Sequence, residues 1–488
     1  MISKTKIGIF YGLSLLFILI NCYLVVNRGI LFFNFAPLAF ILFFALFYSF
    51  EKTLLLSVFF VPLSVPLKNY LPIDFNLDIP TEPIFICILF IFVLVQLKDR
   101  NFSSKIILHP VSLSIIFYLL WRLITTLTSS MPLVSFKYWM MLLWLIIPFY
   151  FVIIPIFKNK NNINKFFWFY IISFCIVITY VLIKHSFSGF SQTTSNYVAK
   201  PFFNDHTSYG AALAMYIPIL IGFIFNKEFS KKMRTVSLIV LGYFIIAIIF
   251  SYTRAAWVSL IGALAIFIVL KLKINYKIIV SIVIVAVGAF FLFQDQIFFA
   301  LENNKQDSST NFGEHVKSIT NVATDASNLE RINRWNCAIR MYHDKPVFGW
   351  GPGTYQFQYA PYQYSYEKTI ISTNSGNLGN AHSEYLGTLS ESGLIGMMSF
   401  IIVLILIFTT AIKSYNRTQS GSIRILITST LCGLITYFIH GFLNNFLDID
   451  KIAIPFWGFA AVIVAIDLYL TNQEKNIKSP DNSFQINQ

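Results

Sequence analysis

The chain has 488 residues, of which 56% are hydrophobic and 17% aromatic, whereas only 12% are charged. A soluble domain carries about 25% charged residues, so this composition excludes an ordinary soluble protein. The formal net charge of +14 would suit a nucleic-acid-binding protein, but the basic residues lie in short loops between apolar runs and form no single patch. We therefore expect no nucleic-acid partner.

Apolar runs of about 15 to 20 residues recur along the chain, and so many runs cannot all be buried core helices. They predict an all-α, polytopic transmembrane protein with about 12–14 spanning helices. The first run has no small-residue cleavage site, so we interpret it as a spanning helix and not as a signal peptide. In chain order the expected spans lie near residues 7–26, 30–50, 53–67, 84–97, 106–127, 139–157, 166–183, 208–225, 236–250, 255–270, 278–293, 393–411, 423–442 and 452–470.

Nearly every second loop between these runs is basic, which by the positive-inside rule places those loops in the cytoplasm. An even number of spans then puts both termini in the cytoplasm and the other loops on the outer face. The expected parts of this one membrane domain are transmembrane helices with short loops (1–293), a large, helical outer loop (294–392), C-terminal transmembrane helices (393–470) and a cytoplasmic tail (471–488).

Polar residues that could take part in binding or catalysis fall on the predicted outer face. Lys200 and His206 lie in the outer loop that precedes the run at 208–225, and Arg254 ends the short turn that begins at Ser251. The cytoplasmic loops are short and basic, and none has a Gly-rich phosphate-binding motif. The pattern therefore predicts that a functional site lies on the outer face and that ATP does not drive it.

The large outer loop holds two helical patterns separated by a glycine-rich turn. Residues 328–342 have apolar side chains at three- and four-residue spacing, which predicts an amphipathic helix with Arg331 and Trp335 on one face and Arg334 beside them. The glycines at 349, 351 and 353 predict an irregular turn with free backbone amides. Asn380 and His382 then lead into a helical stretch that is expected to enter the membrane at Gly393.

These pieces resemble the O-antigen ligase and O-antigen polymerase superfamily of bacterial membrane glycosyltransferases. The resemblance covers most of the chain in architecture and is sharpest at 251–257 and 331–396. It rests on Ser-Tyr-Thr-Arg at 251–254, on Arg331 and Trp335 followed by the glycine turn, and on His382-Ser383, nine residues and then Gly393-x-x-Gly396. The last spacing is similar to that of the ligase branch, although related polymerases and protein O-glycosylating enzymes share much of it.

The resemblance implies a location in the bacterial inner membrane and a periplasmic catalytic loop at 294–392. It also implies a glycan donor on undecaprenyl diphosphate, a glycan or lipid A-core acceptor, and neither a cofactor nor a metal. An arginine fork binds a diphosphate well, and a histidine can accept the proton of an attacking hydroxyl. The expected roles are therefore catalytic base for His382, diphosphate binding for Arg254, Arg331 and Arg334, and possible substrate contacts for Lys200, His206, Trp335 and Asn380.

A metal site is not expected, because the large outer loop has no pair of carboxylates at Asp-x-Asp spacing. Asp448 and Asp450 have that spacing further along the chain, beside Lys451, and we interpret them as a solvated turn at a helix end. Glu384 is the carboxylate nearest to His382 in sequence, but on a helix its side chain would point away from the histidine.

Less specific interpretations of the same residues stay open at this point. His382 would also suit an interfacial histidine, Arg254 a helix-end residue that reaches lipid headgroups, and Arg331 and Arg334 the solvated face of a surface helix. A polytopic lipid-glycan transporter and a non-catalytic membrane scaffold are the rival functional classes. A transporter predicts charged residues near the middle of the membrane and corresponding broken helices in two halves of the chain.

Overall fold

The computed structural model describes residues 12, 14–21, 23, 49–67, 77–99, 102–272, 326–369, 372 and 379–471. The chain divides into two compact units, residues 1–56 and residues 57–488. The described residues of the predicted span at 7–26 are helical. The predicted span at 278–293 and nearly all of that at 30–50 lie outside the described residues, as does the start of the large outer loop.

Within the described residues, ten helices are long and apolar enough to cross a membrane. This confirms the all-α, polytopic class. The ten are α4 (Thr81–Asp99), α6 (Pro110–Leu127), α7 (Pro132–Ile146) with its continuation to Ile156 through a π-helical turn (Ile147–Val152) and α8 (Ile153–Ile156), α9 (Lys160–Ser186), α11 (His206–Phe225), α12 (Lys231–Phe250), α13 (Arg254–Lys271), α18 (Glu384–Arg417), α19 (Gly421–His440) and α20 (Asp450–Ala465), which continues as a π-helix (Ile466–Leu470).

The predicted span at 53–67 is wrong. Helix α3 (Phe50–Phe60) has only 11 residues and ends in a turn before strand β1 (Val65–Pro66), which pairs antiparallel with β2 (Asp78–Ile79). Pro62 and Pro66 explain the difference, because proline lacks the amide hydrogen that a continuing helix needs.

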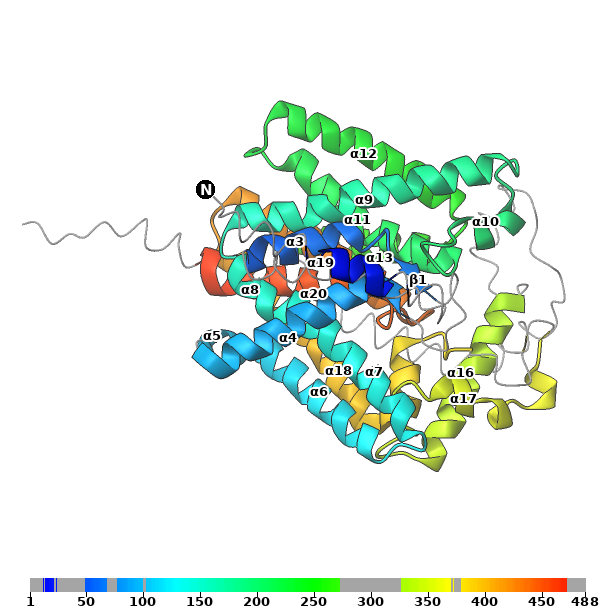
Figure 1. The fold of residues 1–488 in the computed structure, drawn as a ribbon. Helices are drawn as coiled ribbons and strands as arrows, with labels where there is room; N and C mark the ends of the chain where they lie inside the picture. Colours follow the sequence, from blue (N-terminus) through cyan, green and yellow to red (C-terminus); the bar gives the residue numbers. More distant parts are fainter. Residues whose placement is uncertain are drawn as a thin grey trace, which may run out of the picture. The chain divides into compact units, whose positions relative to one another are not determined.

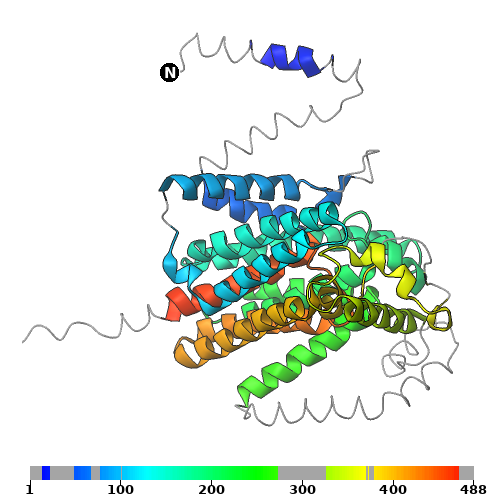
Figure 2. The ribbon, with the colours of Figure 1, turned by 90° about the horizontal axis from the view of Figure 1, so that it is seen from below.

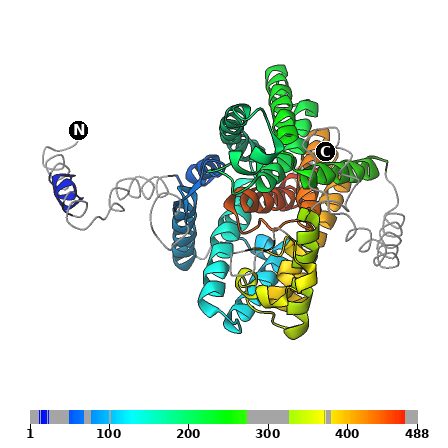
Figure 3. The same cartoon turned by 90° about the vertical axis from the view of Figure 1, so that its right-hand side faces the viewer.

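Helix α20 lies at the centre of the second unit. Figure 3 shows it, in red, between the green helices α11 to α13 on one side and α6, α7 and α18 on the other. In α20 and α11, 83% of the apolar window is buried inside the protein, against 22% in α12 and α13. Helices α12 and α13 therefore offer most of their surface to lipid, whereas α11 and α20 form the core.

A second layer of short elements lies at one end of this bundle. Figures 1 and 2 show α16 (Ala326–Asp344) across the end of the helices, followed by α17 (Tyr355–Gln358) near the turn between α6 and α7. Helix α16 confirms the amphipathic helix predicted at 328–342. The remaining short helices are α5 (Ser104–Ile107), α10 (Gln192–Val198) and two 3-10 turns (Ala360–Tyr362 and Ser365–Glu367).

Asp450 and Lys451, at the start of α20, are buried and not part of a solvated turn. Their side chains are 1% and 2% exposed, and the Lys451 ammonium lies 3.1 Å from Asp450 and 3.3 Å from Asp78. Ser64 and Thr81 each donate a hydrogen bond to Asp450, at 2.8 and 2.6 Å. Charges removed from water need such partners, so this network joins the β1–β2 region to the start of α20.

Candidate functional site

Helix α18 is broken at Gly393, which has the left-handed φ of +68°. The break frees carbonyl groups that the glycine turn then uses: Trp350 N donates to Ser390 O at 3.0 Å and Gly351 N to Glu391 O at 2.8 Å. A Cβ atom at Gly393 would lie 2.1 Å from the carbonyl oxygen of Val347. The expectation of free amides in the turn is therefore wrong for Trp350 and Gly351, because these amides hold the broken helix.

The same turn is inserted against the connection between α6 and α7. A Cβ atom at Gly351 would lie 2.0 Å from Ser129 Oγ, and one at Gly353 would lie 2.9 Å from the Tyr138 ring. Ser130 N donates to Trp350 O at 3.0 Å. The glycines that carry the family resemblance are thus required by close packing against neighbouring elements.

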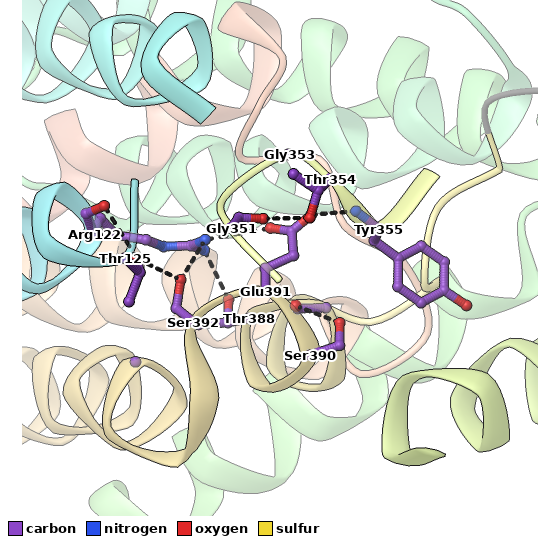
Figure 4. Close-up of polar contacts among 12 residues, drawn as sticks. Arg122, Thr125, Gly351, Gly353, Thr354, Tyr355, Thr388, Ser390, Glu391 and Ser392 are labelled. Atoms are coloured by element: carbon purple, nitrogen blue, oxygen red, sulfur yellow. Dashed lines mark hydrogen bonds and ion pairs between the residues drawn. The ribbon is translucent and has the colours of Figure 1, made fainter. Parts of the chain in front are cut away.

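Arg122, on α6, joins this turn to the broken helix (Figure 4). The side chain is 2% exposed and lies 3.3 Å from Glu391 Oε2, and it also donates to Thr388 and Ser392 at 3.0 and 3.1 Å. Figure 4 shows Glu391 between Arg122 and Tyr355, whose backbone N–H donates to Glu391 Oε1 at 3.2 Å. Sequence reasoning missed this pairing, because the two residues lie 269 positions apart.

His382 precedes this half of α18 and has a backbone held by its neighbours. Its φ is +49°, a left-handed value that is uncommon for a residue with a side chain. The amide of His382 donates to Asn380 Oδ1 at 3.1 Å, and its carbonyl accepts from Trp335 Nε1 at 3.3 Å. Burial, followed by the positive charges of Arg331 and Arg334, lowers the pKa of His382 to about 4. The imidazole is therefore neutral at physiological pH.

Residues from other segments lie close to His382 or to its neighbour His440. Arg331 donates from Nε to Leu443 O at 3.3 Å and acts electrostatically on both His382 and His440, as does Asp205. Thr253, which precedes Arg254, donates to His206 O at 2.7 Å, and α13 packs along α19, the helix that ends at His440. We name Arg254, Arg331, His382 and His440 the basic cluster.

Arg334 is placed differently from Arg331. It is 4% exposed, its Nε lies 2.7 Å from Glu330 Oε1, and its guanidinium lies 3.9 Å from the centre of the Tyr359 ring. The solvated-face interpretation is therefore wrong for Arg334. Its predicted contact with a diphosphate stays a prediction, and the ion pair with Glu330 means that binding would have to compete with a partner already present.

The other predicted contact residues fall into two groups. Trp335 and Asn380 each form a hydrogen bond with the backbone of His382, so the structure places both beside the proposed base. Lys200 is exposed, and its ammonium lies 5.7 Å from the centre of the Tyr197 ring. In the part of the chain that the structure describes, no contact given for Lys200 joins it to the basic cluster.

A polar cavity of about 90 Å³ borders the 380–383 segment. We name it the acidic cavity, because Glu384, Glu391 and Asp448 contribute to its wall. Arg122, Tyr138, Gly353, Tyr355, Gln356, Asn380, Ala381, Ser383, Gly387, Thr388 and Asn445 complete the lining. Of these residues, the sequence predicts a substrate contact only for Asn380, and the Asp448-x-Asp450 spacing is interpreted there as a solvated turn.

Residues 237–401 match a protein-family model described as O-Antigen ligase. This segment of the chain is therefore similar to the O-antigen ligase family. The matched segment includes Arg254, Arg331, Trp335, His382 and the glycine turn, so it spans most of the residues gathered above. It supports a membrane glycosyltransferase of the O-antigen ligase and polymerase type, with glycan and lipid-linked substrates. No curated protein matches the chain.

Proposed function

We propose that this O-antigen ligase-like protein moves a glycan from undecaprenyl diphosphate to an acceptor hydroxyl on the periplasmic face of the bacterial inner membrane. The observation that carries the proposal is the meeting of a neutral, backbone-fixed His382 with the positive charge of Arg331. A base beside fixed positive charge is the arrangement that transfer from a diphosphate requires.

In the proposed reaction the acceptor oxygen attacks C1 of the first donor sugar from the face opposite to the diphosphate. The new C1–O bond forms as the bond from C1 to the diphosphate oxygen breaks, so the anomeric centre inverts. His382 takes the acceptor proton. Arg254 and Arg331 stabilise the charge of the leaving diphosphate, which keeps the bonding electron pair.

The low pKa of free His382 suits this sequence of events. A base with a pKa near 4 accepts a proton poorly. Burial is the largest cause of this low pKa, and the positive charges of Arg331 and Arg334, which are expected to bind the donor, lower it further. An anionic diphosphate beside Arg331 offsets their effect, so the pKa of His382 rises when the donor binds. The base thus becomes effective only in the complex with its donor.

A transfer assay with purified protein in proteoliposomes tests this proposal. His382→Ala should insert and bind donor lipid but lose transfer by about a hundred- to ten-thousand-fold. His343→Ala, at the exposed end of α16, is the matched control and should stay active. Transfer should persist in EDTA, and near-normal turnover by His382→Ala would remove the catalytic assignment.

The orientation is part of the proposal and has its own test. Reporter fusions at Ser309 and Ser479 should report periplasm and cytoplasm, respectively. Cytoplasmic activity at Ser309 would place the basic cluster on the wrong side of the membrane for a periplasmic transferase.

A repeat-unit polymerase of the same superfamily remains the second candidate, because the family match covers both types. Loss of the gene distinguishes them: undecaprenyl-linked polymer accumulates if the protein is a ligase, whereas single repeat units reach the acceptor if it is a polymerase. A lipid-glycan transporter, the candidate from another class, would move the donor across the bilayer with no new glycosidic bond.

A further inference from the structure

The acidic cavity has the composition of a site for an uncharged, hydroxyl-rich ligand. Its wall combines carboxylates, amides and hydroxyls with the aromatic residue Tyr138. Carboxylate and amide oxygens accept hydrogen bonds from sugar hydroxyls, and aromatic faces pack against the apolar C–H face of a sugar ring. A volume of about 90 Å³ exceeds the roughly 10–15 Å³ that one water needs.

Two acceptor atoms at this cavity receive no hydrogen bond from the described residues. The three hydrogen bonds that reach the Glu384 carboxylate, from Tyr437 OH and from the amides of Phe446 and Leu447, all end on Oε1, so none reaches Oε2. The buried Oδ1 atom of Asn445 likewise accepts no hydrogen bond in the described part of the chain. A buried acceptor is normally satisfied, so Asn445 Oδ1 points to a missing donor.

The charge of the cavity decides between ligand classes. Arg122 is paired with Glu391, and among the described residues no ion pair reaches Glu384 or Asp448, so the wall has more acidic than basic groups and disfavours an anion such as a phosphate. Partial desolvation in the cavity, then the charges of Glu384 and Glu391, raises the pKa of Asp448 to about 7. In the described ranges no three His, Cys, Asp or Glu side chains are arranged to hold a metal ion, so a hydrogen-bonding ligand fits better.

We propose that the acidic cavity binds an uncharged sugar ring of one of the two glycan substrates through Glu384, Asn445 and Asp448. The inference rests on the proposed glycosyl transfer. Asn380 and Ser383 line the cavity and flank His382, so a sugar held there lies next to the proposed base. Donor and acceptor glycans both contain uncharged sugar rings, and the KM measured for each substrate distinguishes them.

Binding is measured first, without turnover, by saturation-transfer NMR on the full chain in detergent micelles. The probes are the methyl glycosides of glucose, galactose, mannose and N-acetylglucosamine. At least one should receive saturation from wild type, and the signal should fall by about tenfold in the double variant Asp448→Asn/Asn445→Ala. Asp344→Asn, an exposed carboxylate on α16, is the matched control and should keep the signal.

Pyrophosphate binding, measured in parallel, separates this inference from the proposed function. Loss of pyrophosphate binding in Arg331→Ala with an unchanged glycoside signal supports two distinct sites. No signal from any glycoside with wild type, an unchanged signal in the double variant, or displacement of the glycosides by Mg²⁺ would overturn the sugar site and leave the basic cluster untouched.

The kinetic arm uses the transfer assay with the same double variant. A rise of about tenfold in the KM for one glycan substrate, with little change in the other KM, identifies which substrate occupies the cavity. A fall in kcat with both KM values unchanged would contradict a binding site.

Discussion

The basic cluster and the acidic cavity share one short segment, residues 380–383, and they differ in how their charges are arranged. In the cavity wall, Arg122 and Glu391 are buried together and satisfied by hydroxyl and amide groups. In the cluster, Arg331 is half-buried and faces two histidines, with Asp205 as the carboxylate that acts on both. Paired buried charge builds a scaffold, whereas cations gathered near neutral bases create an anion site.

The largest effect is expected when the scaffold pair is broken. Arg122→Met leaves the buried Glu391 carboxylate without its cation, so the free energy of unfolding should fall by about 3–5 kcal/mol. Thermal unfolding in detergent measures this loss. The double variant Arg122→Met/Glu391→Gln removes both charges and should recover part of the stability. Arg417→Ala, at a 46% exposed position, is the control and should have little effect. Equal stability of wild type and Arg122→Met would contradict the scaffold assignment.

A change at Gly393 should be the next most severe. Alanine there keeps the left-handed φ only at a cost of about 1–2 kcal/mol and meets the Val347 carbonyl as well. Thermal unfolding should therefore show lower stability and the transfer assay lower activity, because the glycine turn and the half-helix move together. Gly421→Ala is the control, since a Cβ atom there meets nothing within 4 Å. A stable Gly393→Ala protein would show that α18 continues across this position without strain.

Arg331→Lys should affect activity and leave stability almost unchanged. Lysine keeps the charge but loses the planar fork, so kcat/KM should fall by roughly tenfold, as expected for one lost hydrogen bond to a charged group. Arg340→Lys, on the same helix but ion-paired with Glu367, is the control and should be nearer to wild type. If both variants lose the same activity, the basic cluster has no special relation to the donor.

The smallest effect is a shift in pH dependence. His382 acts as a base only when it is neutral, so activity is lost as the pH falls through its pKa. In the free enzyme that pKa is about 4, and kcat/KM should keep its acid limb near that value. Bound diphosphate raises the pKa, so the acid limb of kcat should lie at higher pH. Arg331→Gln removes a positive charge near His382, so the acid limb of kcat/KM should move to higher pH. Coincident limbs near pH 6.5 would contradict the electrostatic picture.

The helical class, α16 and the helical stretch that follows His382 could be predicted from the local sequence pattern. The prediction of a span at 53–67 was wrong because it followed the apolar composition and neglected Pro62 and Pro66. The pairing of Arg122 with Glu391 could not be predicted, since nothing local links residues 269 positions apart. The acidic cavity could not be predicted for the same reason. Its wall combines α6, α7, the glycine turn, α18 and the loop before α20, which meet only in the folded chain.

The central position of α20 has a consequence for how the protein is made. It is the last of the described helices to leave the ribosome, yet it is enclosed by helices synthesised before it, with an ion pair at its first turn. The earlier helices must therefore enter the membrane before the helix that fills their centre has been made. A nonsense mutation just before Asp450 should be as damaging as a much earlier one, because it removes the core of the bundle.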